Sequence, residues 1–217
     1  MEYVKVCGLK IYNDIQLSIN HGATAVGFIY DVLESPRNLG ESKINMLIKN
    51  IPKDIKTVLV FKPKNIIKIR KVVNKINTNL YQIHGNFDNN ELEKIPENLK
   101  KRIIVATKLN RRNINSVFNL INQFQDRFFA FLIDNSEGHG KVLDFDIVQE
   151  ILKNRGKARI ILAGGINIEN VTDIVKKLNP YGIDVSSSLE IEKGVKDPYK
   201  ITQFLDKVNY LKQKLIM

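Results

Sequence analysis

The sequence predicts an α/β protein with the closed (β/α)8 architecture of a TIM barrel, and three observations support this prediction. Short runs rich in β-branched residues alternate with segments whose apolar residues recur at helical spacing. The runs are nearly continuous in apolar residues, as is typical of parallel strands that helices cover. Eight runs occur within 217 residues, which is at the small end of the range for an eight-unit barrel. An open, doubly wound sheet is the alternative arrangement.

The predicted strands are residues 4–7, 25–30, 57–61, 80–83, 103–106, 128–133, 159–163 and 182–186. Segments such as 66–76 and 114–124 carry apolar residues three or four positions apart and are predicted to be helices. Asp144, Asn167 and Asp197 stand where helices are expected to begin, and their side chains suit N-cap positions.

Composition indicates one ordinary globular domain spanning residues 1–217. The hydrophobic fraction of 43% and the charged fraction of 26% exclude a disordered or fibrous chain, and no linker or low-complexity tract interrupts the pattern. The net charge of +11 raises the question of nucleic-acid binding, but Lys and Arg are dispersed along the chain. We therefore expect no nucleic-acid partner, and positive charge that at most steers an anionic, phosphorylated substrate.

Cys7 is the single cysteine, so an intrachain disulfide is excluded. Without a recognisable leader, the chain is expected in a reducing, cytoplasmic compartment. No apolar stretch approaches the roughly 18 residues that a membrane span requires, so no membrane partner is expected. The three histidines, His21, His84 and His139, show no metal-ligand spacing, and we expect no metal.

Functional residues of such a barrel cluster at the carboxyl ends of its strands. The first strand ends in Cys7, and side-chain alternation places Lys5 and Cys7 together on the face toward the barrel axis. The sixth strand ends at Asp134 on the same rim. A thiol and a carboxyl on nearly opposite strands would face one substrate as base and acid. The simpler alternatives are an inert apolar thiol and a carboxylate that only caps a turn.

The seventh and eighth strands are followed by Gly164-Gly165 and by Ser186-Ser187-Ser188. Glycines allow backbone N–H groups to approach an anion, and the loops after these two strands form the recurrent phosphate site of this fold. An ordinary tight turn is the alternative.

Further polar residues are expected at the rim. Arg37 suits a bidentate grip on a carboxylate, although an exposed loop arginine is commonly only solvated. Gln82 and His84 end the fourth strand, where a lone histidine is more commonly structural than catalytic. Because strand eight neighbours strand one in a closed barrel, Asp184 is expected to pair with Lys5 across the seam.

Short fragments spanning nearly the whole chain carry a family resemblance. They are Lys5-Val6-Cys7-Gly8-Leu9, Ser35-Pro36-Arg37, Gln82-Ile83-His84-Gly85, Asp134 with Gly138-His139-Gly140-Lys141, Leu162-Ala163-Gly164-Gly165, Asp184-Val185-Ser186-Ser187 and Gly194-Val195-Lys196-Asp197. Together and in this order, they resemble the phosphoribosylanthranilate isomerases.

The resemblance implies a (β/α)8 enzyme of tryptophan biosynthesis that performs an Amadori rearrangement of N-(5-phosphoribosyl)anthranilate without a cofactor, as a monomer or homodimer. By matching position, Cys7 is the general base and Asp134 the general acid. The implied substrate-binding residues are Arg37 at the anthranilate carboxylate, Gly164, Gly165, Ser186, Ser187 and Ser188 at the phosphate, and Gln82, His84 and Asp184. We also hypothesise that Lys5 and the developing substrate iminium favour the Cys7 thiolate.

Departures from the family pattern are few. Glu137 and His139 replace Gly and Thr in a glycine-rich loop, Ser188 stands where Gly is common, and Lys10 replaces a usual Thr. Two other phosphate-binding barrels are alternatives, the sugar isomerase of histidine biosynthesis and indole-glycerol-phosphate synthase. The histidine-pathway isomerase has a carboxylate at the position of Cys7. The synthase needs catalytic lysines, and no lysine of this sequence can be placed on the matching strands. A basic binding module without enzymatic activity is the remaining alternative.

Overall fold

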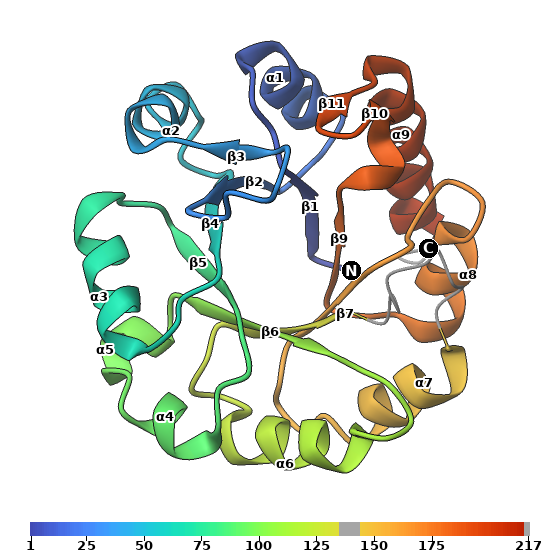
Figure 1. The fold of residues 1–217 in the computed structure, drawn as a ribbon. Coiled ribbons are helices and arrows are strands. Elements are labelled where there is room, and N and C mark those ends of the chain that lie inside the picture. The colour runs from blue at the N-terminus through green and yellow to red at the C-terminus, as the bar shows by residue number, and fades with distance from the viewer. Residues whose placement is uncertain (135–143, 215–217) are drawn as a thin grey trace.

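The chain forms a ring of parallel strands surrounded by helices in the computed structural model, which describes residues 1–134 and 144–214 (Figure 1). The strands of the main sheet are β1 (Tyr3–Cys7), β2 (Ala25–Tyr30), β3 (Asn38–Leu39), β4 (Lys56–Phe61), β5 (Leu80–His84), β6 (Ile103–Lys108), β7 (Ala130–Asp134), β8 (Ile160–Ala163) and β9 (Gly182–Val185). They pair in the order β1-β9-β8-β7-β6-β5-β4-β2-β3.

A further pairing between β1 and β2 closes the sheet. Lys5 lies opposite Ala25 and Cys7 opposite Gly27 on one side of β1, while Lys5 lies opposite Asp184 of β9 on the other. Eight parallel strands therefore form a closed barrel, and β3 extends β2 outside it. The predicted (β/α)8 fold is confirmed, and the open doubly wound sheet is excluded.

The helices lie outside the ring, and all except the C-terminal α9 belong to connections between successive strands (Figure 1). They are α1 (Tyr12–Asn20), α2 (Glu41–Ile48), α3 (Ile66–Lys75), α4 (Asn89–Glu93), α5 (Glu97–Lys100), α6 (Ile114–Phe124), α7 (Phe145–Lys153), α8 (Val171–Asp173) continued by a π-helical turn (Ile174–Leu178), a 3-10 turn (Ser187–Leu189) and α9 (Pro198–Lys214). Within the two described stretches of chain, no helix combines the length and apolar character needed to cross a membrane.

Two of the three predicted helix caps are confirmed. The Asp144 side chain accepts a hydrogen bond from the Ile147 N–H, and the Asp197 side chain accepts two at the start of α9. Asn167 accepts hydrogen bonds from the N–H groups of Glu169 and Asn170 in the manner of an N-cap, but these residues form a turn and α8 itself begins only at Val171. A short amide side chain competes well for nearby backbone donors and so favours such a turn.

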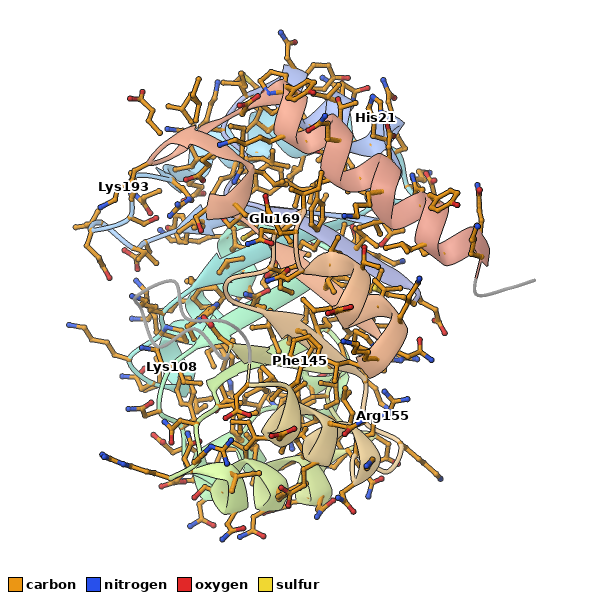
Figure 2. The ribbon with its side chains drawn as sticks, turned by 90° about the vertical axis from the view of Figure 1, so that its right-hand side faces the viewer. His21, Lys108, Phe145, Arg155, Glu169 and Lys193 are labelled. Atoms are coloured by element: carbon orange, nitrogen blue, oxygen red, sulfur yellow. The ribbon has the colours of Figure 1, made fainter. Side chains whose placement is uncertain are left out.

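Two apolar layers hold the barrel together. Side chains between the ring and the helices form the larger core, and a smaller cluster fills the interior with residues such as Val58, Ile104, Leu132 and Ile161. The barrel is therefore a packed core, and its open space lies at the rim. In Figure 2, Lys108 and Lys193 mark the left-hand rim where the strands end, and Arg155, which precedes β8, lies toward the opposite end.

The short hairpin of β10 (Glu190–Glu192) and β11 (Val195–Lys196) was not predicted. Its two antiparallel strands follow the 3-10 turn after β9 and lie beside α1 and α9 at the rim (Figure 1). Strands of two or three residues carry too little periodicity to be distinguished from a loop in the sequence.

Candidate active site

A cavity of about 600 Å³ opens at the carboxyl ends of the strands. Every predicted site residue lines it: Cys7, Arg37, Gln82, His84, Asp134, Gly164, Gly165, Asp184, Ser186, Ser187 and Ser188. The apolar side chains of Ile29, Val60 and Leu132 also face this space. The closed barrel thus gathers residues that lie up to 181 positions apart in the printed sequence around one small-molecule site.

Cys7 ends β1 inside the barrel and is only 6% exposed, yet its side chain reaches the cavity. Gly27 of β2 makes room for it. A Cβ atom at position 27 would lie 2.6 Å from Lys5 Cε and 2.9 Å from the Cys7 Sγ, so a larger residue would displace both. Sequence reasoning missed Gly27, because a glycine within a predicted strand indicates only some close approach.

Lys5 lies beneath Cys7 and is fully buried. Its Nζ donates to Asp184 Oδ2 at 2.7 Å and to Gln82 Oε1 at 2.6 Å. The predicted pairing of Lys5 with Asp184 across the seam is therefore confirmed. The other atom of the Gln82 amide, Nε2, lies 2.8 Å from His84 Nε2, so a continuous hydrogen-bonded row joins β9, β1 and β5 beneath the cavity.

Burial is the main influence on the Cys7 thiol and raises its pKa above the ordinary value. The positive charges of Lys5 and Lys196 act in the opposite direction, and Asp184 raises the pKa further. Burial alone would lower the pKa of Lys5, but Asp184 and Cys7 raise it above its usual value, so Lys5 is an ammonium. The resting site therefore holds a neutral thiol beside a cation.

His84 is neutral at physiological pH. Burial, followed by the positive charge of Lys5, lowers the pKa of its imidazole from 6.5 to about 4. Because one ring nitrogen lies against the Gln82 amide, the ring has a fixed orientation at the cavity wall.

Asp134 ends β7, three strands around the ring from Cys7 by way of β8 and β9. Its side chain is partly exposed and lines the cavity. The predicted glycine-rich loop that follows it, including Glu137, His139 and Lys141, lies outside the described residues.

The loops after β8 and β9 form one side of the cavity. Gly164 and Gly165 have φ angles of 84° and 66°, which turn the backbone immediately after β8. The Ser186 hydroxyl donates to the Cys7 carbonyl at 3.1 Å. Two buried polar atoms at the cavity, Ser188 Oγ and Asp184 Oδ1, have no hydrogen-bond partner among the residues that the structure describes. Unsatisfied buried groups of this kind are costly unless a ligand completes them.

Arg37 extends over the rim from the loop after β2, and its guanidinium is already engaged. Its Nε and Nη2 each donate to a different carboxylate oxygen of Glu190, both at 2.6 Å. Glu190 also accepts from Lys196 Nζ at 3.0 Å. Sequence reasoning did not select Glu190 or Lys196, because neither stands at the end of a barrel strand.

Among residues 1–134 and 144–214, His, Cys, Asp and Glu side chains nowhere gather in a group of three that could hold an ion.

A closed barrel whose rim brings a thiol, a carboxyl and two polar turns around one small cavity defines a (β/α)8 enzyme of small-molecule metabolism. The family model "N-(5'phosphoribosyl)anthranilate (PRA) isomerase" matches residues 4–207. The chain therefore belongs to the phosphoribosylanthranilate isomerase family, whose members are aldose–ketose isomerases of tryptophan biosynthesis.

Individual relatives agree with this family. An N-(5'-phosphoribosyl)anthranilate isomerase of Acetivibrio thermocellus is 34% identical, with 96% of each chain covered, and one of Methanosarcina acetivorans is 29% identical, with 94% of this chain and 92% of the relative covered. The solved phosphoribosyl anthranilate isomerase of Thermotoga maritima superposes with a TM-score of 0.83 at 28% identity, covering 97% of this chain and 100% of the other. A further solved isomerase, with a TM-score of 0.79, 28% identity and the same coverages, holds reduced 1-(o-carboxyphenylamino)-1-deoxyribulose 5-phosphate.

Proposed function

We propose that this chain converts N-(5-phosphoribosyl)anthranilate to 1-(2-carboxyphenylamino)-1-deoxyribulose 5-phosphate, with Asp134 as general acid and Cys7 as general base. The observation that carries the proposal is the shared cavity, which the Cys7 thiol and the Asp134 carboxyl enter from different strands. A substrate ribose between two such groups can lose a proton on one side and gain one on the other.

The acid step opens the sugar. Asp134 gives its proton to the ribose ring oxygen as the bond between that oxygen and C1′ breaks, and the anthranilate nitrogen shares its lone pair with C1′. The product is an open-chain, positively charged iminium, and Asp134 becomes a carboxylate. No external oxidant or reductant is required, because the rearrangement only moves protons and electron pairs within the substrate.

The base step moves hydrogen from C2′. The Cys7 thiol first releases its proton to solvent, and the resulting thiolate takes the C2′ proton. The electrons of the C–H bond then form the C1′–C2′ double bond of an enolamine while the iminium nitrogen is neutralised. The enolamine then tautomerises to the ketone, its C2′ hydroxyl losing a proton as C1′ gains one. The raised pKa of the buried Cys7 thiol makes its conjugate thiolate a strong base, and the neighbouring Lys5 ammonium and the substrate iminium both favour its formation.

Two anchors hold the ribose between these groups. We assign the phosphate to the backbone of Gly164 and Gly165 and to the serine turn, where the unpartnered Ser188 hydroxyl is available. Asp184 Oδ1 is an available acceptor for a ribose hydroxyl. Arg37 takes the anthranilate carboxylate. Binding energy at both ends of the substrate is thereby used to orient the reacting carbons.

Gln82 and His84 complete the wall between the anchors. The neutral imidazole of His84, fixed against Gln82, offers the substrate a polar contact without adding charge beside the iminium. We propose that the chain acts as one catalytic domain without a cofactor, as a monomer or homodimer in the cytoplasm. Among the solved relatives are monomers derived from the dimeric Thermotoga maritima isomerase.

The test follows the fluorescence of freshly generated phosphoribosylanthranilate as purified protein consumes it. We expect turnover by the wild type and losses of at least 100-fold in kcat/KM for Cys7→Ser and Asp134→Asn, in keeping with the usual contribution of a general acid or base. Absence of wild-type turnover would reject the assigned reaction. Full activity in either variant would reject the role of that residue.

A further inference from the structure

Glu190 is a nearly fully buried carboxylate at the rim, and its side chain is only 4% exposed. It follows the serine turn, as the first residue of β10. Four donors surround it: Arg37 Nε and Lys196 Nζ reach Oε1 at 2.6 and 3.0 Å, while Arg37 Nη2 and the Gly194 N–H reach Oε2 at 2.6 and 3.1 Å. A carboxylate so completely satisfied has no capacity left to act on a substrate itself.

The surrounding donors keep Glu190 ionised. Burial by itself raises the pKa of this carboxyl, but the hydrogen bonds from Arg37, Gly194 and Lys196 outweigh it and lower the pKa to about 2. Each donor therefore faces a full negative charge, which makes these hydrogen bonds stronger than neutral ones.

Arg37 is held in one place by this carboxylate and by the backbone beneath it. Its side chain crosses Gly8, where a Cβ would lie 2.5 Å from Arg37 Cδ. With Nε and Nη2 turned to Glu190, the remaining guanidinium nitrogen, Nη1, has no partner among the described residues, and the side chain lines the cavity. A guanidinium is planar, so fixing one edge also fixes the direction of the other donors.

Lys196 connects the same carboxylate to the catalytic strand. Its Nζ donates to Glu190 Oε1 at 3.0 Å and to the Ser186 carbonyl at 2.8 Å. The Ser186 hydroxyl in turn donates to the Cys7 carbonyl. Glu190 thus links the loop that carries Arg37, the serine turn after β9 and the end of β1 that carries Cys7.

We propose that Glu190 is a positioning residue that orients Arg37 for the carboxylate of the substrate and, through Lys196, holds the arginine in register with the serine turn and Cys7. The inference rests on the proposed function, since it takes Arg37 as the carboxylate-binding residue. Its consequence is selectivity: Glu190 determines how strongly the enzyme prefers a substrate that carries a carboxylate on its aromatic ring.

The experiment compares two ligands. One is reduced 1-(o-carboxyphenylamino)-1-deoxyribulose 5-phosphate, and the other is the same compound with an unsubstituted phenylamino group. Calorimetry gives the ratio of their dissociation constants for the wild type, for Glu190→Gln and for Glu192→Gln. Glu192 is the matched control, because it lies two residues along the same hairpin strand and is exposed.

We expect the wild type to bind the carboxylated compound at least tenfold more tightly, as a charged hydrogen-bonded contact predicts. In Glu190→Gln this ratio falls toward one while the affinity for the phenylamino compound stays within about twofold, and Glu192→Gln keeps the wild-type ratio. A merely structural role for Glu190 would weaken both ligands alike, and that result overturns the proposal. An unchanged ratio in Glu190→Gln overturns it as well.

A second variant serves if Glu190→Gln does not fold. Glu190→Asp retains the charge but moves it back by one methylene group. We expect this variant to fold and to show a smaller ratio between the dissociation constants of the two ligands than the wild type. A folded Glu190→Asp protein with the wild-type ratio contradicts the proposal. Measurements on the wild type distinguish failure of this inference from failure of the proposed function. If the wild type turns over phosphoribosylanthranilate and prefers the carboxylated ligand, failure of the variants rejects only the role of Glu190, whereas a wild type that does neither rejects the proposed function.

Discussion

Replacement of Lys5 by Met tests the electrostatics beneath the active site. Lys5 is fully buried, and its Nζ lies 2.7 Å from Asp184 Oδ2 and 2.6 Å from Gln82 Oε1. Methionine fills a similar volume without a charge. The variant therefore leaves the Asp184 carboxylate buried without its counter-ion.

The expected cost follows from the burial of this pair. Removing one partner of a buried ion pair typically destabilises a protein by about 3–5 kcal/mol, because an uncompensated charge remains inside. This is a large share of a total stability on the order of 5–15 kcal/mol. In the double variant Lys5→Met/Asp184→Asn the buried charge is absent, so we expect most of the loss to be recovered.

Urea unfolding followed by circular dichroism measures these differences. Lys10→Met is the matched control. Within the described residues the ammonium of Lys10 donates only to the Pro36 carbonyl, at 3.2 Å in an exposed contact, so a change within about 0.5 kcal/mol is expected there. If Lys5→Met is as stable as the wild type, or if the double variant is no more stable than Lys5→Met, the reasoning about the pair is refuted.

The same variant reports on the Cys7 thiol. Lys5 lowers the pKa of Cys7, so its removal moves the midpoint of Cys7 alkylation to higher pH and slows alkylation at a fixed pH below that midpoint. Because Cys7 is the single cysteine, iodoacetamide labelling followed by mass spectrometry reads this group alone. Identical alkylation profiles for the wild type and Lys5→Met would exclude the proposed influence of Lys5.

Two further predictions concern the walls of the site. Gly27→Ala places a Cβ within 2.9 Å of both Lys5 and Cys7, and we expect it to lower the free energy of unfolding in urea by about 1–3 kcal/mol and to reduce turnover. Gly40→Ala is the control, because a Cβ there has no atom within 4 Å, and we expect a loss of less than about 1 kcal/mol. Equal losses in the two variants would contradict the steric argument. The imidazole of His84 should titrate near pH 4 when followed by NMR. The free energy of unfolding should fall as the pH drops from 6.5 toward 4, because the unfolded chain takes up the proton first. A titration midpoint near 6.5 would disprove the burial of His84.

The sequence was sufficient to predict the barrel because its signals are local. Continuous β-branched runs such as 57–61 indicate buried parallel strands wherever they occur. The number and spacing of these runs limit the ways in which the strands can form a closed sheet. The short strands β3, β10 and β11 were missed for the same reason, since two or three residues form no period. Their existence depends on neighbours that pack against them rather than on their own composition.

The location of the polar site was also predictable. A closed barrel carries the carboxyl end of every strand to one rim, so Cys7, Asp134 and the turns at Gly164 and Ser186 had to lie around a common opening once the fold was known. Strand adjacency likewise predicted the Lys5–Asp184 pair. These inferences needed only the order of the strands and the alternation of side chains along each one.

The state of the groups within that site could not be predicted. The sequence suggested that Lys5 favours the Cys7 thiolate, and Lys5 does lower the pKa of the thiol, but burial raises it more. Burial is a property of the closed barrel, in which Gly27 brings β2 close enough to enclose both side chains. No spacing along the chain reports that depth.

The sequence by itself determined the barrel, the rim that carries the polar site and which residues end at that rim, because strand composition and side-chain alternation are local properties. Only the tertiary structure decided that Arg37 is bound by Glu190, 153 residues further along the chain, and that Lys196 joins this pair to the strand of Cys7. Such contacts form between a loop and a hairpin whose strands are too short to show a repeating pattern. Their partners are selected by the three-dimensional path of the backbone and by the need of each buried charge for a counter-charge.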